Sequence, residues 1–139
     1  MSKPLVTLKY FAVRGRAEPI RLLLEELQIP YNDVQVQLKD WLQTKPTLKF
    51  KQLPVYEEKH PSGDESKTLV IPQSQAILRY LARKYDVYGK TESERIRCDI
   101  VEELAQDFII EIGLLIWDKK FNEHRDSFIT NKLSPHLEL

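Results

Sequence analysis

The sequence predicts an α/β domain followed by an all-helical region. In residues 1–85, short β-prone runs alternate with segments whose apolar residues recur at helical spacing. From residue 86 onward the apolar residues follow helical spacing alone. The 139 residues, 42% of them hydrophobic, suffice for one full domain and part of another. We therefore expect an α/β domain over residues 1–85 and an incomplete helical domain over residues 86–139.

The first domain opens with a strand, a turn and a helix. Residues 5–10 are β-prone, and Arg14-Gly15-Arg16 breaks this run. Residues 17–27 then carry apolar side chains at helical spacing, and Pro30 ends the helix. Beyond Pro30, Val34, Val36 and Leu38 alternate with polar residues, as in a half-buried strand. Because a helix connects the two strands, we expect them to be parallel.

Two further strands are predicted at residues 54–57 and 68–71. The polar loop 59–67 joins them and contains proline and glycine, so the pair is a hairpin with a long tip. A helix follows over residues 74–85. The resulting order is βαβ, an irregular stretch and then ββα, which is the order of the thioredoxin-like fold.

The later part of the chain is predicted to be helical. Thr91 and Glu94 have the spacing of a capping box in front of a long helix. The region from Arg125 to the end again has helical spacing. No partner elements follow it, which is why the helical domain is expected to be incomplete.

Charge and composition exclude several classes of function. Basic and acidic residues both number 21, so no net positive field attracts nucleic acid or an anionic membrane. The single cysteine, Cys98, cannot form an internal disulfide, and no apolar run has the length of a membrane span. The histidines lack the spacing of a metal site. We expect a cytoplasmic protein without a bound metal.

Tyr10 is the candidate catalytic residue. It ends the first predicted strand, just before a loop with Arg14 and Arg16. Positive charge there would stabilise a phenolate, or an anion that is hydrogen-bonded to the hydroxyl. A hydroxyl in this place could hold a thiol as its thiolate. By spacing alone, a core or rim tyrosine is the alternative.

Two proline-containing segments are candidates for binding an extended anionic peptide. Pro54 begins a strand, and a cis bond there would turn the Leu53 backbone toward a ligand, whereas a trans bond is the alternative. Gln73 and Ser74 open a helix, so Ser74 can cap it while free backbone amides face a carboxylate. Plain helix capping without a ligand is the alternative for Ser74.

Trp41 and Lys45 are candidates for a second carboxylate contact. They lie four residues apart in the irregular stretch before Gln52. An indole N–H and an ammonium that reach one point would suit a terminal carboxylate. Alone, each residue is equally an ordinary surface or packing residue.

Together these segments resemble the cytosolic glutathione S-transferase family over essentially the whole chain. The segment from Tyr10 to Glu18 looks like the family's catalytic-tyrosine segment. Gln52-Leu53-Pro54 and residues 72–77 look like its two glutathione-binding segments. The run from Trp41 to Gln52 is most similar to the sigma class, which includes glutathione-dependent prostaglandin D synthases.

The resemblance implies a role for each candidate residue. Tyr10 would stabilise the glutathione thiolate, and Gln73 with Ser74 would hold the γ-glutamyl end. Asp99 matches an acidic residue that reaches the γ-glutamyl amine bound to the partner subunit of a homodimer, although an exposed helix acid is the alternative. Phe50 matches a position near that dimer interface. The remaining contacts to the tripeptide would come from Arg16, Trp41, Lys45, Gln52, Leu53 and Pro54.

Three functions follow as hypotheses. The first is conjugation of glutathione, as co-substrate, to a hydrophobic electrophile in detoxification. The second is isomerisation of a prostaglandin endoperoxide with the same thiolate. The third is a non-catalytic or truncated module that binds or supports without turnover. Conjugation is the main hypothesis and the other two are alternatives. Family members continue through further helices that complete the acceptor pocket, and the short chain is the feature that favours the third hypothesis.

Overall fold

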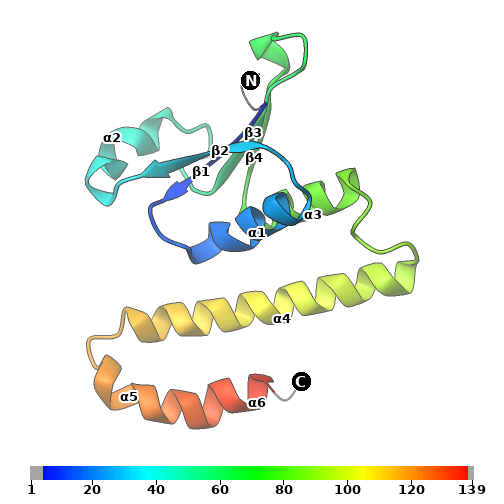
Figure 1. The fold of residues 1–139 in the computed structure, drawn as a ribbon. Coiled ribbons are helices and arrows are strands. Elements are labelled where there is room, and N and C mark those ends of the chain that lie inside the picture. The colour runs from blue at the N-terminus through cyan, green and yellow to red at the C-terminus, as the bar shows by residue number, and fades with distance from the viewer. Residues whose placement is uncertain (1–4, 138–139) are drawn as a thin grey trace. The chain divides into compact units, whose positions relative to one another are not determined.

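The computed structural model describes residues 5–137, and the chain divides into two compact units between Val87 and Tyr88. The first unit contains a sheet with helices, and the second contains helices alone (Figure 1).

The first unit is built on a four-stranded mixed sheet in the order β2-β1-β3-β4. β1 pairs in parallel with β2, as predicted, and antiparallel with β3, which pairs antiparallel with β4. This arrangement confirms the thioredoxin-like fold. The elements are β1 (Val6–Phe11), α1 (Glu18–Glu26), β2 (Tyr31–Val36), β3 (Val55–Glu58), β4 (Leu69–Pro72) and α3 (Ser74–Lys84).

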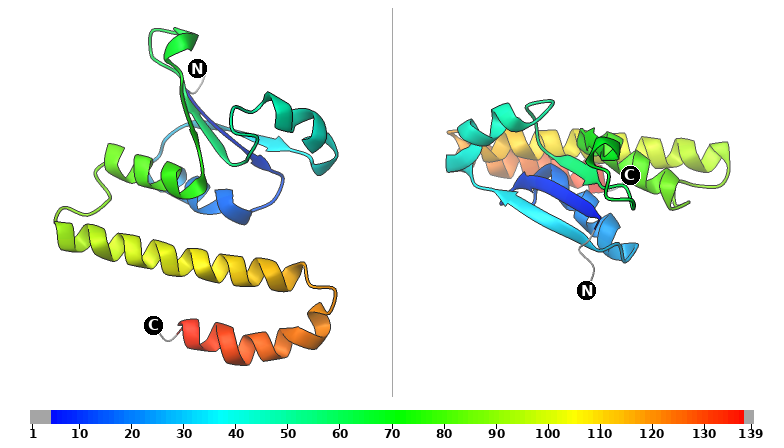
Figure 2. Two further views of the ribbon diagram at one scale, coloured as in Figure 1. Left: turned by 180° about the vertical axis from the view of Figure 1, so that it is seen from behind. Right: turned by 90° about the horizontal axis from the view of Figure 1, so that it is seen from above.

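The core of this unit lies between the sheet and helices α1 and α3, which cover the same face of the sheet (Figures 1 and 2). Successive β1 residues alternate between buried and partly buried, because side chains in a strand point to opposite faces. Ile20 and Leu24 from α1 meet Ile77 and Leu81 from α3 in this core, and all four are fully buried. Their i, i+4 spacing places each pair on one face of its helix.

Two sequence predictions were wrong around β2. The strand ends at Val36, so Leu38 lies outside it in a 3₁₀ helix (Leu38–Asp40) and is 70% exposed. Val34 lies within the strand but is also exposed, because β2 is an edge strand. The stretch that follows is not irregular but continues through α2 (Trp41–Thr44) and a second 3₁₀ helix (Lys45–Thr47).

The second unit begins with the 25-residue helix α4 (Glu92–Ile116). The predicted capping box is confirmed: Thr91 accepts a hydrogen bond from the Glu94 N–H, and Glu94 accepts one from the Thr91 N–H. Helix α5 (Phe121–Phe128) begins earlier than the predicted Arg125 and continues through a π-helix (Ile129–Leu133) into α6 (Ser134–Leu137). None of the described helices combines the length and apolar character needed to cross a bilayer.

Candidate glutathione-binding site

A cavity of about 440 Å³ opens in the first unit where the predicted binding segments meet. Its walls come from the end of β1, the loop before α1, the short helix α2, the segment that leads into β3, and the start of α3. The lining residues are Phe11, Arg16, Trp41, Lys51, Gln52, Leu53, Pro54, Gln73 and Ser74. Sheet topology therefore gathers residues that are up to 63 positions apart in the sequence, from Phe11 to Ser74.

The two predicted glutathione-binding segments both line this cavity. The Leu53-Pro54 peptide bond is cis, which the sequence left open. The side-chain amide of Gln73 donates a hydrogen bond to the Gln52 carbonyl oxygen at 2.7 Å. This bond joins the segment before β3 to the start of α3, so it fixes the position of these two segments relative to each other.

The start of α3 differs from the prediction in its capping residue. Gln73, rather than Ser74, is the N-cap: its carbonyl accepts the Ile77 N–H at 3.0 Å, and its side chain makes no capping bond. Ser74 is the first helical residue and is buried, with 6% of its surface exposed. The chain turns through Gln73 with φ +73°, and strained non-glycine residues of this kind concentrate at ligand sites. The first amides of α3 remain available to an anion.

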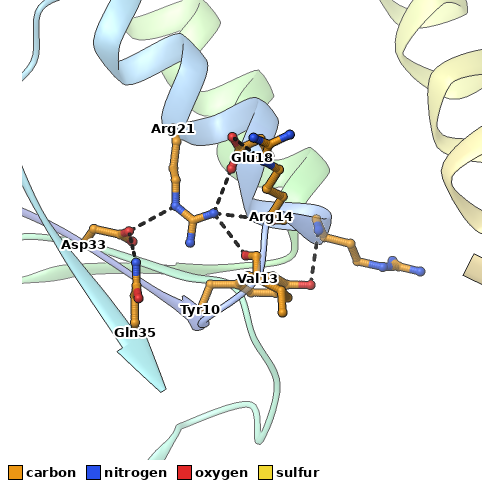
Figure 3. Close-up of polar contacts among 8 residues, drawn as sticks. Tyr10, Val13, Arg14, Glu18, Arg21, Asp33 and Gln35 are labelled. Atoms are coloured by element: carbon orange, nitrogen blue, oxygen red, sulfur yellow. Dashed lines mark hydrogen bonds and ion pairs between the residues drawn. The ribbon is translucent and has the colours of Figure 1, made fainter. Parts of the chain in front are cut away.

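Tyr10 lies on the buried face of β1 with 8% of its surface exposed. Its hydroxyl oxygen accepts a hydrogen bond from the Arg16 backbone N–H at 3.2 Å (Figure 3). Arg16 lines the cavity, whereas Tyr10 is not among its lining residues. Because a backbone donor occupies the oxygen, the hydroxyl proton is left to donate elsewhere.

An aromatic row leads from Tyr10 toward Trp41. The Tyr10 and Phe11 ring centroids are 5.6 Å apart, and those of Phe11 and Trp41 are 5.1 Å apart, both edge to face. Lys45 places its ammonium 5.8 Å from the centre of the Trp41 ring but does not line the cavity. Trp41 and Lys45 are thus neighbours, as their spacing predicts, although Trp41 alone reaches the cavity.

The structure adds Phe11 and Lys51, which the sequence analysis missed. Phe11 follows Tyr10 on a strand, so alternation places it on the opposite face, and that signal was available. Lys51 directly precedes Gln52, but its position depends on a left-handed backbone with φ +53°. Among the described lining residues Arg16 and Lys51 are cationic and none is acidic. The cavity is therefore suited to an anion.

Asp99 lies on α4 in the second unit, where its carboxylate accepts a hydrogen bond from the Tyr88 hydroxyl at 2.5 Å. Within residues 5–137, no cluster of three histidine, cysteine, aspartate or glutamate side chains has the arrangement of a metal site.

Comparison with known protein families matches the first unit to one of them. Residues 6–83 match the family described as "Glutathione S-transferase, N-terminal domain". The chain belongs to the glutathione S-transferase family. The matched region runs from the start of β1 into the last turn of α3, so it contains every residue that lines the cavity.

Several glutathione S-transferases and related enzymes are similar to the chain. Rat hematopoietic prostaglandin D synthase is 36% identical over 137 residues, which cover 96% of this chain and 63% of that protein. "Glutathione S-transferase P 1" of Xenopus laevis is 40% identical over 118 residues, which cover 82% and 52%. A solved sigma-class glutathione S-transferase from Fasciola hepatica superposes with a TM-score of 0.88 at 29% identity, covering 99% of this chain and 65% of that one. The chain thus spans between half and two thirds of the length of these relatives.

Proposed function

We propose that the chain binds glutathione in this cavity and joins it, through its thiolate sulfur, to hydrophobic electrophiles. The proposal rests on the cavity in the thioredoxin-like unit. Its lining residues include the cations Arg16 and Lys51 and no acidic side chain. Glutathione is an extended tripeptide with a carboxylate at each end. An elongated anion of this kind needs cations or free amides at both ends of its site and backbone pairing between them.

The tripeptide is oriented by the two sides of the cavity. Its γ-glutamyl carboxylate lies at the start of α3, by Gln73 and Ser74, where the helix dipole and free amides favour an anion. Its central residue pairs with the Leu53 backbone beside Pro54. The remaining contacts, including those to its glycine carboxylate, come from Arg16, Trp41, Lys51 and Gln52, and Lys45 contributes its charge from beside the Trp41 ring.

Tyr10 supplies the chemistry of the thiol. Its hydroxyl donates a hydrogen bond to the sulfur, which favours the thiolate because hydrogen bonds to the charged form lower a pKa. The thiol proton leaves to solvent, the sulfur lone pair forms a bond to an electrophilic carbon, and the leaving group departs with its electron pair. The enzyme forms no covalent intermediate.

The Tyr10→Phe variant tests this role. We expect it to bind glutathione with nearly the parent affinity and to conjugate it about tenfold more slowly, because one hydrogen bond to an anion is lost. Calorimetric titration with glutathione and a thiol-conjugation assay measure the two quantities. A parent chain that binds glutathione without turnover would favour the non-catalytic module, and a parent that does not bind would overturn the proposal.

The Lys51→Met variant tests whether the positive charge of the cavity contributes to glutathione binding. We expect Lys51→Met to weaken glutathione binding about twofold to fivefold at low salt and less at high salt, because the charge is exposed and screened. Lys49→Met is the matched control, since Lys49 packs over the Phe50 ring and does not line the cavity. Equal losses in both variants would mean that the cavity does not select for this cation.

A dimeric, cytoplasmic protein of the sigma class is also part of the proposal. Residues 1–85 would form the glutathione-binding domain and residues 86–139 part of the helical domain. Asp99 would reach the glutathione bound to the partner subunit, and Phe50, which is 48% exposed, would lie at the interface. Light scattering measures the oligomeric state. A monomer would overturn the role of Asp99, because no partner subunit would then hold a glutathione for it to contact.

Isomerisation of a prostaglandin endoperoxide is a second candidate. It is favoured by the similarity to rat hematopoietic prostaglandin D synthase over 96% of this chain. The same thiolate would serve both reactions, and the acceptor pocket would differ. Incubating the glutathione-loaded protein with a prostaglandin endoperoxide, and separately with an aryl halide, distinguishes isomerase from transferase.

A further inference from the structure

A network around Arg21 holds the loop that carries the Tyr10 contact (Figure 3). Arg21 lies on the first turns of α1, and only 14% of its side chain is exposed. Its guanidinium reaches three parts of the first unit: the loop after β1, its own helix, and strand β2. Arg21 is not among the residues that line the cavity.

The guanidinium uses its nitrogens on different partners. Nη1 donates to the carbonyl oxygens of Val13 and Arg14, at 3.2 and 3.4 Å. The same nitrogen lies 3.0 Å from Glu18 Oε2. Nε donates to Asp33 Oδ2 at 3.2 Å. A planar guanidinium can satisfy this spread of acceptors, whereas a lysine ammonium is a single point charge.

The two carbonyls that Arg21 holds immediately precede the residues that contact Tyr10. Gly15 follows Arg14 with φ +43°, and the next amide, that of Arg16, donates to the Tyr10 hydroxyl. A shift of the loop would therefore separate this amide from the hydroxyl. Donation from the amide polarises the hydroxyl and strengthens its own donation, since hydrogen bonds in a chain reinforce one another.

We propose that Arg21 is a positioning residue for the thiolate site: through the Val13 and Arg14 carbonyls it holds the Arg16 amide on the Tyr10 hydroxyl. This inference rests on the proposed function, because it assigns Tyr10 as the donor to the glutathione sulfur. Arg21 itself touches neither the sulfur nor the tripeptide. Its effect reaches them through a loop that is anchored at both carbonyls.

The variants are chosen to separate positioning from general stability. Arg21→Lys keeps a cation between Glu18 and Asp33 but has one nitrogen in place of Nη1 and Nε, so it cannot keep both the Asp33 contact and the bonds to the two carbonyls. Arg21→Met removes both. Lys9→Met is the control, because it breaks an ion pair to Glu57 at 2.7 Å between strands β1 and β3, away from the loop. Urea denaturation identifies conditions in which all variants are folded.

We expect both Arg21 variants to bind glutathione about threefold to tenfold more weakly, because a shift of the loop also moves Arg16, which lines the cavity. The thiol of the bound glutathione, followed by the ultraviolet absorbance of its thiolate, should titrate at higher pH than in the parent. The Arg16 amide should exchange faster with deuterated water. The Lys9→Met variant should match the parent in all three measurements.

The measurements test the positioning role of Arg21 separately from the proposed function. Parent-like affinity, thiol titration and Arg16 exchange in Arg21→Lys would overturn the positioning role. Equal losses in Lys9→Met and the Arg21 variants would also overturn it, because the effect would then be one of overall stability. If the parent does not bind glutathione, the proposed function falls, and the Arg16 exchange in Arg21→Lys still decides whether Arg21 holds this amide.

Discussion

Replacing Gly15 with alanine should lower the free energy of unfolding by about 2–4 kcal/mol and weaken glutathione binding by more than tenfold. Gly15 has φ +43°, a conformation that strains any residue with a Cβ atom. A Cβ there would also lie 2.8 Å from the Tyr10 hydroxyl oxygen and 3.1 Å from its Cε1 atom. The Tyr10 ring is buried and cannot retreat without disturbing the core, so the loop must move.

The design includes two comparisons. Gly63→Ala is the matched control, because Gly63 also has a positive φ, of +75°, and an added Cβ would meet nothing within 4 Å. It should therefore show only the conformational part, about 1 kcal/mol. Adding Tyr10→Phe to Gly15→Ala removes the closest oxygen and should restore part of the stability. Chemical denaturation measures the free energy of unfolding of the parent and the three variants. Equal losses of stability in Gly15→Ala and Gly63→Ala would show that a Cβ at position 15 does not clash with Tyr10.

Replacing Glu58 with glutamine should lower the free energy of unfolding by about 2–4 kcal/mol at neutral pH. Glu58 Oε2 accepts hydrogen bonds from the Tyr56 and Tyr80 hydroxyls, each at 2.9 Å, and Oε1 pairs with Lys84. Tyr56 is fully buried, so a weaker acceptor would leave its hydroxyl poorly satisfied. These bonds tie β3 to α3, the helix whose start forms one end of the cavity.

The same cluster sets a pH dependence. Burial alone would raise the pKa of Glu58, but hydrogen bonds from Lys84, Tyr80 and Tyr56 outweigh it and hold the pKa below its ordinary value. A carboxyl with a lowered pKa in the folded chain stabilises the fold above the ordinary carboxyl pKa, and this stability is lost as the pH falls through the folded value. In Glu58→Gln we therefore expect a shallower loss of stability in acid.

The loss of stability at alkaline pH should persist in Glu58→Gln. Burial is the main cause that raises the pKa of Tyr56, ahead of its hydrogen bond to Glu58, and burial remains after the substitution. Stability should thus still fall as the pH rises above the ordinary tyrosine pKa. Denaturation curves across the pH range measure both sides.

Glu57→Gln is the matched control for Glu58→Gln. Glu57 is the preceding residue on β3, its side chain is 26% exposed against 23% for Glu58, and it pairs with Lys9. Loss of this single surface pair should change stability by about 1 kcal/mol or less. If the two substitutions were equally harmful, or the acid limb were unchanged in Glu58→Gln, the cluster would not be the source of the stability.

Most elements could be predicted because their signals are local. The helical spacing of residues 17–27 and 74–85 and the capping box at Thr91 and Glu94 each lie within a few turns of chain. The burial predicted for the second strand was wrong, because burial also depends on which elements pack beside the strand. Val34 and Leu38 alternate like buried strand residues, yet the strand lies at the sheet edge and ends at Val36.

The candidate site was predicted in part. The segments around Leu53 and Ser74 could be assigned as two sides of one site because prolines and a helix start mark them, and both line the cavity. Which lysine lines it could not be predicted, since Lys45 and Lys51 lie in one stretch and backbone turns decide where each side chain goes. The capping residue of α3 was also wrong, because the left-handed turn at Gln73 moves the helix start by one position.

By itself the sequence determined the order of strands and helices, the tyrosine near the end of the first strand, and the two segments, around Leu53 and around Ser74, that both line the cavity. Each depends on residue type and on spacing between near neighbours in the chain. Only the tertiary structure decided that Arg21 anchors the loop over Tyr10, that Glu58 joins a strand to α3, and that Lys51 lines the cavity. These contacts join distant positions, and strand order, register and helix docking set their distances.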